Sequence, residues 1–212
     1  MGVLERRERE KSELREKILD AARELFITEG YEGVSMRKLA EKIEYSPTAI
    51  YAYFADKEDL FHQLCQEDFA KLAAVFQRDA QIQNPLERLR QIGRTYAAFG
   101  HQYPNHYKLM FMTPHPKPCF DEQDQEIRGN PESDAYAFLI EAVRQAIAGG
   151  YVRRELNDAD LIAQTLWAAI HGAISLHIAK SNDTDWVNWR PLETRIETVL
   201  EVTLRGIRRE AK

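Results

Sequence analysis

The stretch that begins at Ser46 constrains the fold more than any other part of the sequence. Ser46 is a helix-capping residue, and Pro47 has the fixed φ that suits the first position of a helix. Ile50 and Phe54 lie four residues apart, so they fall on one apolar face. Asp56 then caps another helix. The sequence therefore predicts a helix of only about two turns, anchored on one side and able to present the other side.

Two further helices are predicted before this short one. From Leu14 to Phe26, apolar residues recur at spacings of three and four, which is the pattern of an amphipathic helix, and Gly30 can end that helix. Ser35 can cap a second helix that has its apolar residues on one side and its charged residues on the other. A tight connection leads from it to Ser46. Such a connection between short helices is the helix-turn-helix arrangement, in which the second helix enters the major groove of DNA.

This order of residues resembles the DNA-binding domain of the tetracycline-repressor (TetR/AcrR) family. The resemblance runs without gaps from Ile18 to Leu64, through the segments AARELF, EGYEGVS, MRKLAEKI and AIYAYFADKEDL. It implies a DNA-binding domain over residues 1–60. It also implies a helical regulatory, ligand-binding and dimerisation domain over residues 61–212.

A DNA-binding surface follows from the resemblance together with side-chain chemistry. Arg37 matches a position that can reach a base, and an arginine can make a bidentate contact to guanine. Tyr51 and Lys57 match positions that contact phosphates. Many relatives have a glycine where Glu44 stands, and a glutamate there is expected to restrict the approach to DNA. The predicted DNA-binding set is Ser35, Arg37, Lys38, Ser46, Pro47, Thr48, Ala49, Tyr51, Ala52, Tyr53 and Lys57.

The charge of the chain does not by itself indicate DNA binding. Residues 1–60 contain 11 Lys and Arg residues against 14 Asp and Glu residues, and the whole chain has a formal net charge of −5. The broad basic surface that is typical of nucleic-acid-binding domains is missing, so we expect weak nonspecific affinity. The acidity also fits an alternative, an all-α protein-binding adaptor with a vestigial helix-turn-helix. Salt-dependent binding to a palindrome would distinguish the two.

The remainder of the chain has helical periodicity as well. A long helix is predicted from Asp56 to about Gln77, and helices restart after Asn84-Pro85 and over His106 to Met112. The prolines of segment 113–131 exclude a helix and predict a surface loop. Periodicity returns from Glu132, and two long helices end the chain. No run of period two competes, so the predicted fold is all-α with about nine helices.

The last two predicted helices carry apolar residues on more than one face. The helix from Asp160 to Lys180 is apolar nearly all round, and such a helix must be buried on all sides. Association of two copies about a two-fold axis would bury this surface and would set two recognition helices on a palindromic operator. Packing inside a monomer is the alternative. The predicted homodimer interface is Ala169, Gly172, Ala173, Leu176, Ile196, Val199, Leu200, Thr203 and Ile207.

A small-molecule effector is implied by the second half of the resemblance. The motif from Trp167 to Gly172, WAAIHG, resembles a Trp-His-Gly stretch in the regulatory domains of one TetR/AcrR subgroup, and HYKLMFM after YPN resembles the same subgroup. In the family this half holds a ligand pocket whose occupation alters DNA affinity. A hydrophobic or aromatic effector is expected. The predicted pocket residues are Tyr96, Phe99, Tyr103, Tyr107, Met110, Phe111, Trp167 and His171, although an aromatic residue or Met at helical spacing is more often a core residue than a pocket residue.

Other classes of protein are not indicated. The sequence has no G-x-S-x-G, P-loop or HExxH motif, so no catalytic residue, cofactor or metal is predicted. Cys65 beside His62 is the best nucleophile candidate, and an ordinary helix surface explains it better. The N-terminus lacks the apolar core of a signal peptide, which favours a cytoplasmic protein. We therefore expect a ligand-responsive, sequence-specific transcriptional regulator that binds double-stranded DNA as a dimer, most often a repressor in this family.

Overall fold

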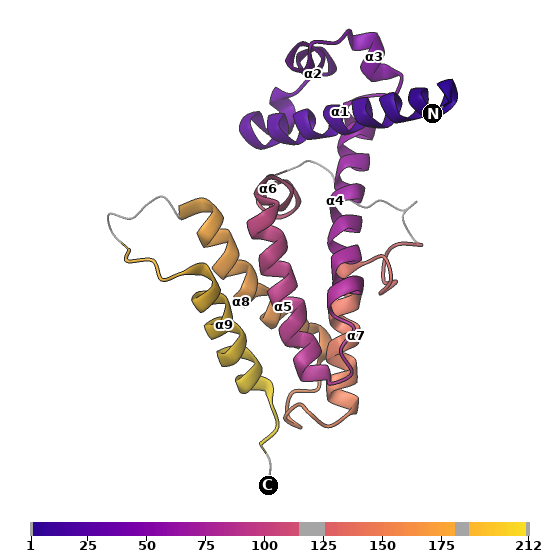
Figure 1. The fold of residues 1–212 in the computed structure, drawn as a ribbon. Coiled ribbons are helices and arrows are strands. Elements are labelled where there is room, and N and C mark those ends of the chain that lie inside the picture. Colours follow the sequence, from indigo (N-terminus) through magenta and orange to yellow (C-terminus); the bar gives the residue numbers. More distant parts are fainter. Residues whose placement is uncertain (1, 115–125, 181–186, 211–212) are drawn as a thin grey trace. The chain divides into compact units, whose positions relative to one another are not determined.

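The computed structural model describes residues 2–114, 126–180 and 187–210. The described residues form nine α-helices and one isolated β-bridge, between Val152 and Arg208 (Figure 1). The prediction of an all-α fold is confirmed. The part of the predicted loop from residue 115 to residue 125 lies outside the described residues. The helices are α1 (Val3–Gly33), α2 (Met36–Ile43), α3 (Pro47–Tyr51), α4 (Lys57–Asp79), α5 (Pro85–Gln102), α6 (Pro104–Phe111), α7 (Ala135–Ala148), α8 (Ala159–Lys180) and α9 (Leu192–Ile207).

The helix starts follow from local capping chemistry. The Ser35 hydroxyl accepts a hydrogen bond from the Lys38 N–H at 3.2 Å, so α2 begins where the sequence predicts. Asn84 accepts from the first N–H groups of α5 in the same way. Gly30 has φ 72° and ψ 171°, which breaks the helical backbone of α1 as predicted, although the span continues to Gly33.

The chain forms two compact units. The first unit contains the residues up to Asp68 and a later segment that begins at Asn105 and includes all of α6 but its first residue. The second unit contains Phe69–Pro104 together with α7, α8 and α9. Helix α4 therefore contributes residues to both units, and the chain enters the first unit twice.

Aromatic and aliphatic side chains fill the core of the first unit. Phe26 stacks on Tyr31 with ring centroids 5.7 Å apart, and Phe61 packs edge-on against Phe26 at 5.1 Å. Ile50 and Phe54 are both 0% exposed, which fixes α3 on this core. The predicted anchoring face of α3 is thus buried.

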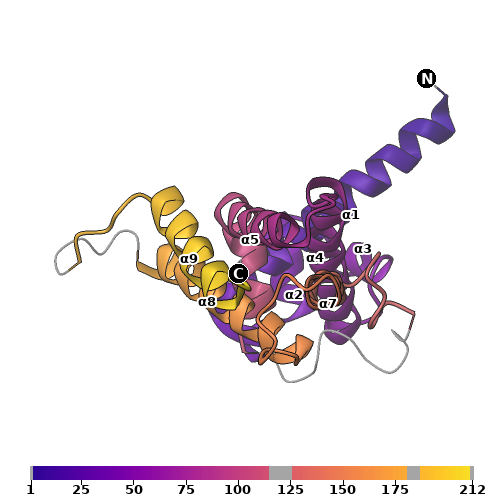
Figure 2. The same cartoon turned by 90° about the horizontal axis from the view of Figure 1, so that it is seen from below.

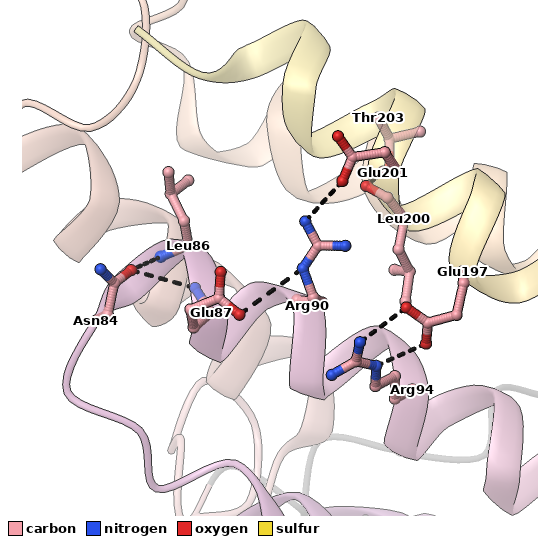
Figure 3. Close-up of polar contacts among 9 residues, drawn as sticks. All are labelled: Asn84, Leu86, Glu87, Arg90, Arg94, Glu197, Leu200, Glu201 and Thr203. Atoms are coloured by element: carbon pink, nitrogen blue, oxygen red, sulfur yellow. Dashed lines mark hydrogen bonds and ion pairs between the residues drawn. The ribbon is translucent and has the colours of Figure 1, made fainter. Parts of the chain in front are cut away.

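In the second unit, α5 packs against α7, α8 and α9, and α8 also packs against α9 (Figures 1 and 2). A Cβ atom at Gly93 of α5 would lie 2.3 Å from Leu200 Cδ2 of α9, so the glycine permits the close approach of these helices. Two ion pairs flank this contact (Figure 3). Arg94 makes a bidentate pair with Glu197 at 2.6 and 2.7 Å, and Arg90 Nη2 lies 3.0 Å from Glu201 Oε2.

Candidate DNA-binding surface and effector site

The short helix α3 presents an exposed polar face opposite its buried anchor. The Ser46 hydroxyl accepts from the Ala49 N–H at 3.2 Å, and Pro47 occupies the first turn. Of the predicted DNA-binding residues, Ala49, Tyr53 and Lys57 are half-buried, and the other eight are exposed: Ser35, Arg37, Lys38, Ser46, Pro47, Thr48, Tyr51 and Ala52. Tyr51 is 53% exposed, which suits its predicted contact to a phosphate.

The turn between α2 and α3 depends on an unusual backbone conformation. Glu44 ends α2 with φ 63° and ψ 40°, in the left-handed region that favours glycine. Its N–H bonds to the end of α2, and the Tyr45 N–H donates to the Ala40 carbonyl at 3.0 Å. Glu44 adopts this conformation at some strain, and a glycine would adopt it freely.

The basic residues of this surface are already paired with carboxylates. Arg37 Nε lies 3.0 Å from Glu41 Oε1, and Lys38 pairs with Glu29 of α1. The Lys57 ammonium donates to the Tyr31 carbonyl at 3.0 Å and lies 4.2 Å from the centroid of the Tyr31 ring. The surface therefore presents cations that have intramolecular partners.

Three predicted effector residues come together in the second unit. Trp167 Nε1 donates to the Tyr96 hydroxyl at 3.0 Å, and that hydroxyl lies 3.0 Å from His171 Nδ1. Because an indole N–H can only donate, the Tyr96 hydroxyl accepts from Trp167, and a second hydrogen bond joins the same hydroxyl to His171 Nδ1. Burial lowers the pKa of His171, which agrees with a neutral imidazole. These three side chains form an uncharged hydrogen-bonded chain.

A fourth member of this cluster, Tyr136 of α7, was missed by the sequence analysis. Its ring centroid lies 5.9 Å from that of Trp167, and its hydroxyl is buried without a hydrogen-bond partner in the part of the chain that the structure describes. A buried hydroxyl without a partner destabilises a protein by about 1–3 kcal/mol. No sequence signal identifies Tyr136, because its role depends on a contact between residues far apart in the chain.

The other predicted effector residues lie in separate groups. Phe99 and Tyr103 of the second unit have ring centroids 5.4 Å apart, and the Lys71 ammonium lies 3.7 Å from the Tyr103 centroid. Tyr107 and Phe111 pack together at 5.1 Å in the first unit, where Met110 is also buried. The predicted residues Tyr96, Trp167 and His171, together with Tyr136, thus form the best-defined candidate site.

A buried ionic network, which no motif or spacing in the sequence predicts, lies in the first unit. Arg23 of α1 donates from Nε and Nη2 to Asp68 of α4, at 3.0 and 2.8 Å. His106 Nδ1 of α6 lies 2.8 Å from Asp68 Oδ1. Burial acts to lower the pKa of Arg23, but the hydrogen bonds and charges of Asp68 and Asp20 together outweigh it and raise that pKa.

Exposed apolar side chains mark α8 and α9. Leu161 is 58% exposed, Leu176 50% and Val202 65%, whereas Ile196, Leu200 and Ile207 of the predicted interface are buried within the chain. Ala169, Gly172, Ala173, Val199 and Thr203 are half-buried. Among the described helices, α8 is also the one that could cross a membrane by length and composition alone, and 28% of its apolar window is buried.

Two family models match the sequence over the regions just described. The model described as bacterial regulatory proteins of the tetR family matches residues 18–64, and the model described as a tetracyclin repressor-like C-terminal domain matches residues 89–190. The chain belongs to the tetracycline-repressor family. The first match coincides with the helix-turn-helix resemblance, which is thereby confirmed. The Trp-His-Gly subgroup of this family remains a prediction.

Curated relatives in the tetracycline-repressor family include the HTH-type transcriptional repressor AcnR of Corynebacterium diphtheriae. It is 41% identical over 69 residues, which cover 32% of this chain and 36% of AcnR. The chain thus spans little more than a third, 36–37%, of the length of the AcnR repressors that it matches first.

Solved structures of the family share the fold. A TetR family transcription regulator from Marinobacter aquaeolei has a TM-score of 0.75 at 18% identity, over 96% of this chain and 100% of that one. The ketosteroid transcriptional regulator KstR2 of Mycobacterium tuberculosis has a TM-score of 0.63 at 19% identity, over 92% of this chain and 95% of that one.

Proposed function

We propose that this protein is a cytoplasmic transcriptional regulator that binds a palindromic operator as a homodimer and responds to a small-molecule effector. The observation that carries the proposal is the two-sided construction of α3. Ser46, Pro47 and Thr48 are exposed on the helix, whereas Ile50 and Phe54 hold it rigidly on the core. A rigid, exposed, hydroxyl-bearing helix suits insertion into the major groove. The name of the relative AcnR supports repression as the outcome of binding.

Selection from a random pool of DNA duplexes tests this function. We expect the purified protein to enrich a palindrome and to lose affinity for it steeply as salt rises. Arg37→Ala should weaken operator binding by about 1–3 kcal/mol and relax the base preference at one position. Arg153→Ala, in the second unit, is the matched control and should change neither quantity. If no sequence is enriched at low salt, the adaptor function becomes the better explanation.

The homodimer rests on the exposed apolar side chains of α8 and α9. Leu161, Leu176 and Val202 are each at least half exposed in the single chain, and there is open space around Gly172 for a partner helix. Burying such side chains favours association by roughly 25 cal/mol per Å² of apolar surface. Leu176→Lys with Val202→Lys should shift sedimentation to the monomer. Gln83→Lys, at an exposed position ahead of α5 in the same unit, should leave the dimer intact.

The effector site is proposed at the cluster of Tyr96, Trp167, His171 and Tyr136. These aromatic side chains are uncharged when His171 is neutral, and the Tyr136 hydroxyl has no hydrogen-bond partner among the described residues. We expect an uncharged, largely apolar compound with a group that hydrogen-bonds to Tyr136. The ketosteroid named for the structural neighbour KstR2 is a compound of this kind.

A binding screen with uncharged aromatic and alicyclic compounds tests the effector site. Compounds that raise the melting temperature of the wild type should bind Tyr136→Phe about tenfold more weakly, which corresponds to one lost hydrogen bond. They should also change operator affinity, because an effector must discriminate between two states of the protein. If no compound that binds the cluster alters operator affinity, the allosteric part of the proposal is wrong.

A further inference from the structure

The region of the family match is acidic, and its basic side chains are all paired. Between Ile18 and Leu64 the sequence contains five Lys and Arg residues and nine Asp and Glu residues. Each of the five basic side chains has a carboxylate oxygen within 4.0 Å. A surface arranged in this way attracts phosphates weakly, because its cations are already neutralised.

Three of these pairs involve predicted DNA-binding residues, and two of the three are formed by residues of α2. Arg37 and Glu41 lie one helical turn apart on α2, with side chains 83% and 64% exposed. Lys38 pairs with Glu29 at the end of α1, so this pair links two helices of the same unit. The pairs are accessible to solvent and can be broken without disturbing the core.

Two further pairs extend the pattern around α2 and the start of α4. Lys42 Nζ lies 3.1 Å from Glu24 of α1. Lys57 Nζ lies 4.0 Å from Glu32, at the limit of an ion pair, and closer to the Tyr31 carbonyl. Every cation that a phosphate would approach here must therefore leave a partner within the chain.

We propose that Glu29 and Glu41 are specificity determinants that hold Lys38 and Arg37 away from random DNA. Nonspecific binding depends almost entirely on phosphate electrostatics. On random DNA no base contact offsets the loss of an internal ion pair, so Lys38 and Arg37 remain paired with Glu29 and Glu41. On the operator, contacts to base edges offset that loss and the cations are exchanged. The glutamates thus lower affinity for random DNA more than affinity for the operator. This inference rests on the proposed DNA-binding function.

The test compares Glu29→Gln with Glu41→Gln, as a double variant, against the wild type on two duplexes. One duplex is the sequence enriched by selection and the other has a scrambled sequence. Exposed pairs of this kind each change affinity by up to about fivefold, so we expect about a tenfold gain on the scrambled duplex and a much smaller gain on the operator. The salt slope on scrambled DNA should steepen by about 0.9 for each freed cation.

A charge-matched control separates this effect from net charge. Glu155→Gln with Glu210→Gln changes the net charge equally in the second unit, and it should leave both affinities nearly unchanged. Equal gains on both duplexes, or no gain on the scrambled duplex, would overturn the inference while leaving DNA binding established. Failure of the wild type to select any sequence would instead overturn the proposed function and this inference with it.

Discussion

Arg23 and Asp68, which are 45 residues apart in the sequence, form a bidentate ion pair in the interior of the first unit. Arg23 is 5% exposed and Asp68 is 1% exposed. The pair joins α1, which supports the helix-turn-helix, to the middle of α4. His106 of α6 contacts the same carboxylate at 2.8 Å, so three helices converge on one buried charge.

Removing one partner of this pair should be strongly destabilising. Asp68→Ala would leave the Arg23 guanidinium buried without its main counter-charge, and we expect a loss of about 3–5 kcal/mol in the free energy of unfolding by urea. Arg23→Met with Asp68→Leu should recover most of that loss, because an apolar pair of similar volume requires no counter-charge. A double variant as unstable as Asp68→Ala would contradict this account. The exposed pair of Arg153 and Glu155 serves as a control, and its removal should change stability by less than about 1 kcal/mol.

Two glycine substitutions should change stability in opposite directions. Gly93→Ala places a methyl group against Leu200 and should destabilise the second unit by about 1–3 kcal/mol, because the buried Leu200 side chain must leave its packed position. Gly206→Ala, in α9 with nothing within 4 Å of the new atom, should stabilise by up to about 1 kcal/mol. Thermal unfolding of both variants measures the difference. A stabilising Gly93→Ala would show that the contact with Leu200 can relax freely.

Glu44→Gly should stabilise the turn of the helix-turn-helix. The left-handed conformation of Glu44 costs about 1–2 kcal/mol for a residue with a side chain, and glycine adopts it without that strain. Part of the gain is offset by the greater freedom of glycine in the unfolded chain, which leaves an expected gain of about 0.5–1 kcal/mol. Gln164→Gly, in the interior of α8, should instead destabilise by about 1 kcal/mol. Chemical denaturation of both variants measures whether each change raises or lowers the free energy of unfolding.

Stability should fall as the pH drops below the normal histidine range. Burial lowers the pKa of His171, so below about pH 6.5 the unfolded chain binds a proton that the folded chain excludes. The contribution of His171 to the free energy of unfolding is therefore fully present above the pKa that His171 has in the unfolded chain. It is lost as the pH falls toward the lower pKa that His171 has in the folded protein. Unfolding measured near pH 7.5 and near pH 5.5 should show a smaller decrease for His171→Gln than for the wild type. An identical decrease in both proteins would show that His171 does not cause the loss of stability at low pH. His177, whose pKa is lowered by burial and by His101 and Arg195, contributes with the same sign and remains in the variant.

The features predicted correctly from the sequence are local ones. Ser35 and Ser46 cap helices through bonds that span three residues, so the neighbouring sequence is sufficient to place them. The exposed face of α3 follows from the spacing of Ile50 and Phe54 in the same way. These relationships depend on helix geometry alone, which is the same in every fold.

The features that the sequence did not reveal depend on tertiary contacts. Neither the approach of Arg23 to Asp68 nor that of Tyr136 to Trp167 follows from any spacing, because the residues of each pair lie on different helices. For α9, the apolar stripe was recognised, but periodicity cannot tell an internal face from one that awaits a partner. Leu200 of the predicted interface packs against Gly93 within the chain.

The alternation of the chain between its two compact units has a consequence for chimeric regulators. A hybrid joined near residue 60, with the helix-turn-helix of this protein and the effector half of a relative, would bring a foreign residue to the position of Asp68 and another to that of His106. Arg23 would then be buried opposite side chains that did not evolve with it. Exchanging operator specificity between family members should therefore require transplanting the first part of α4 and all of α6 along with the recognition helix.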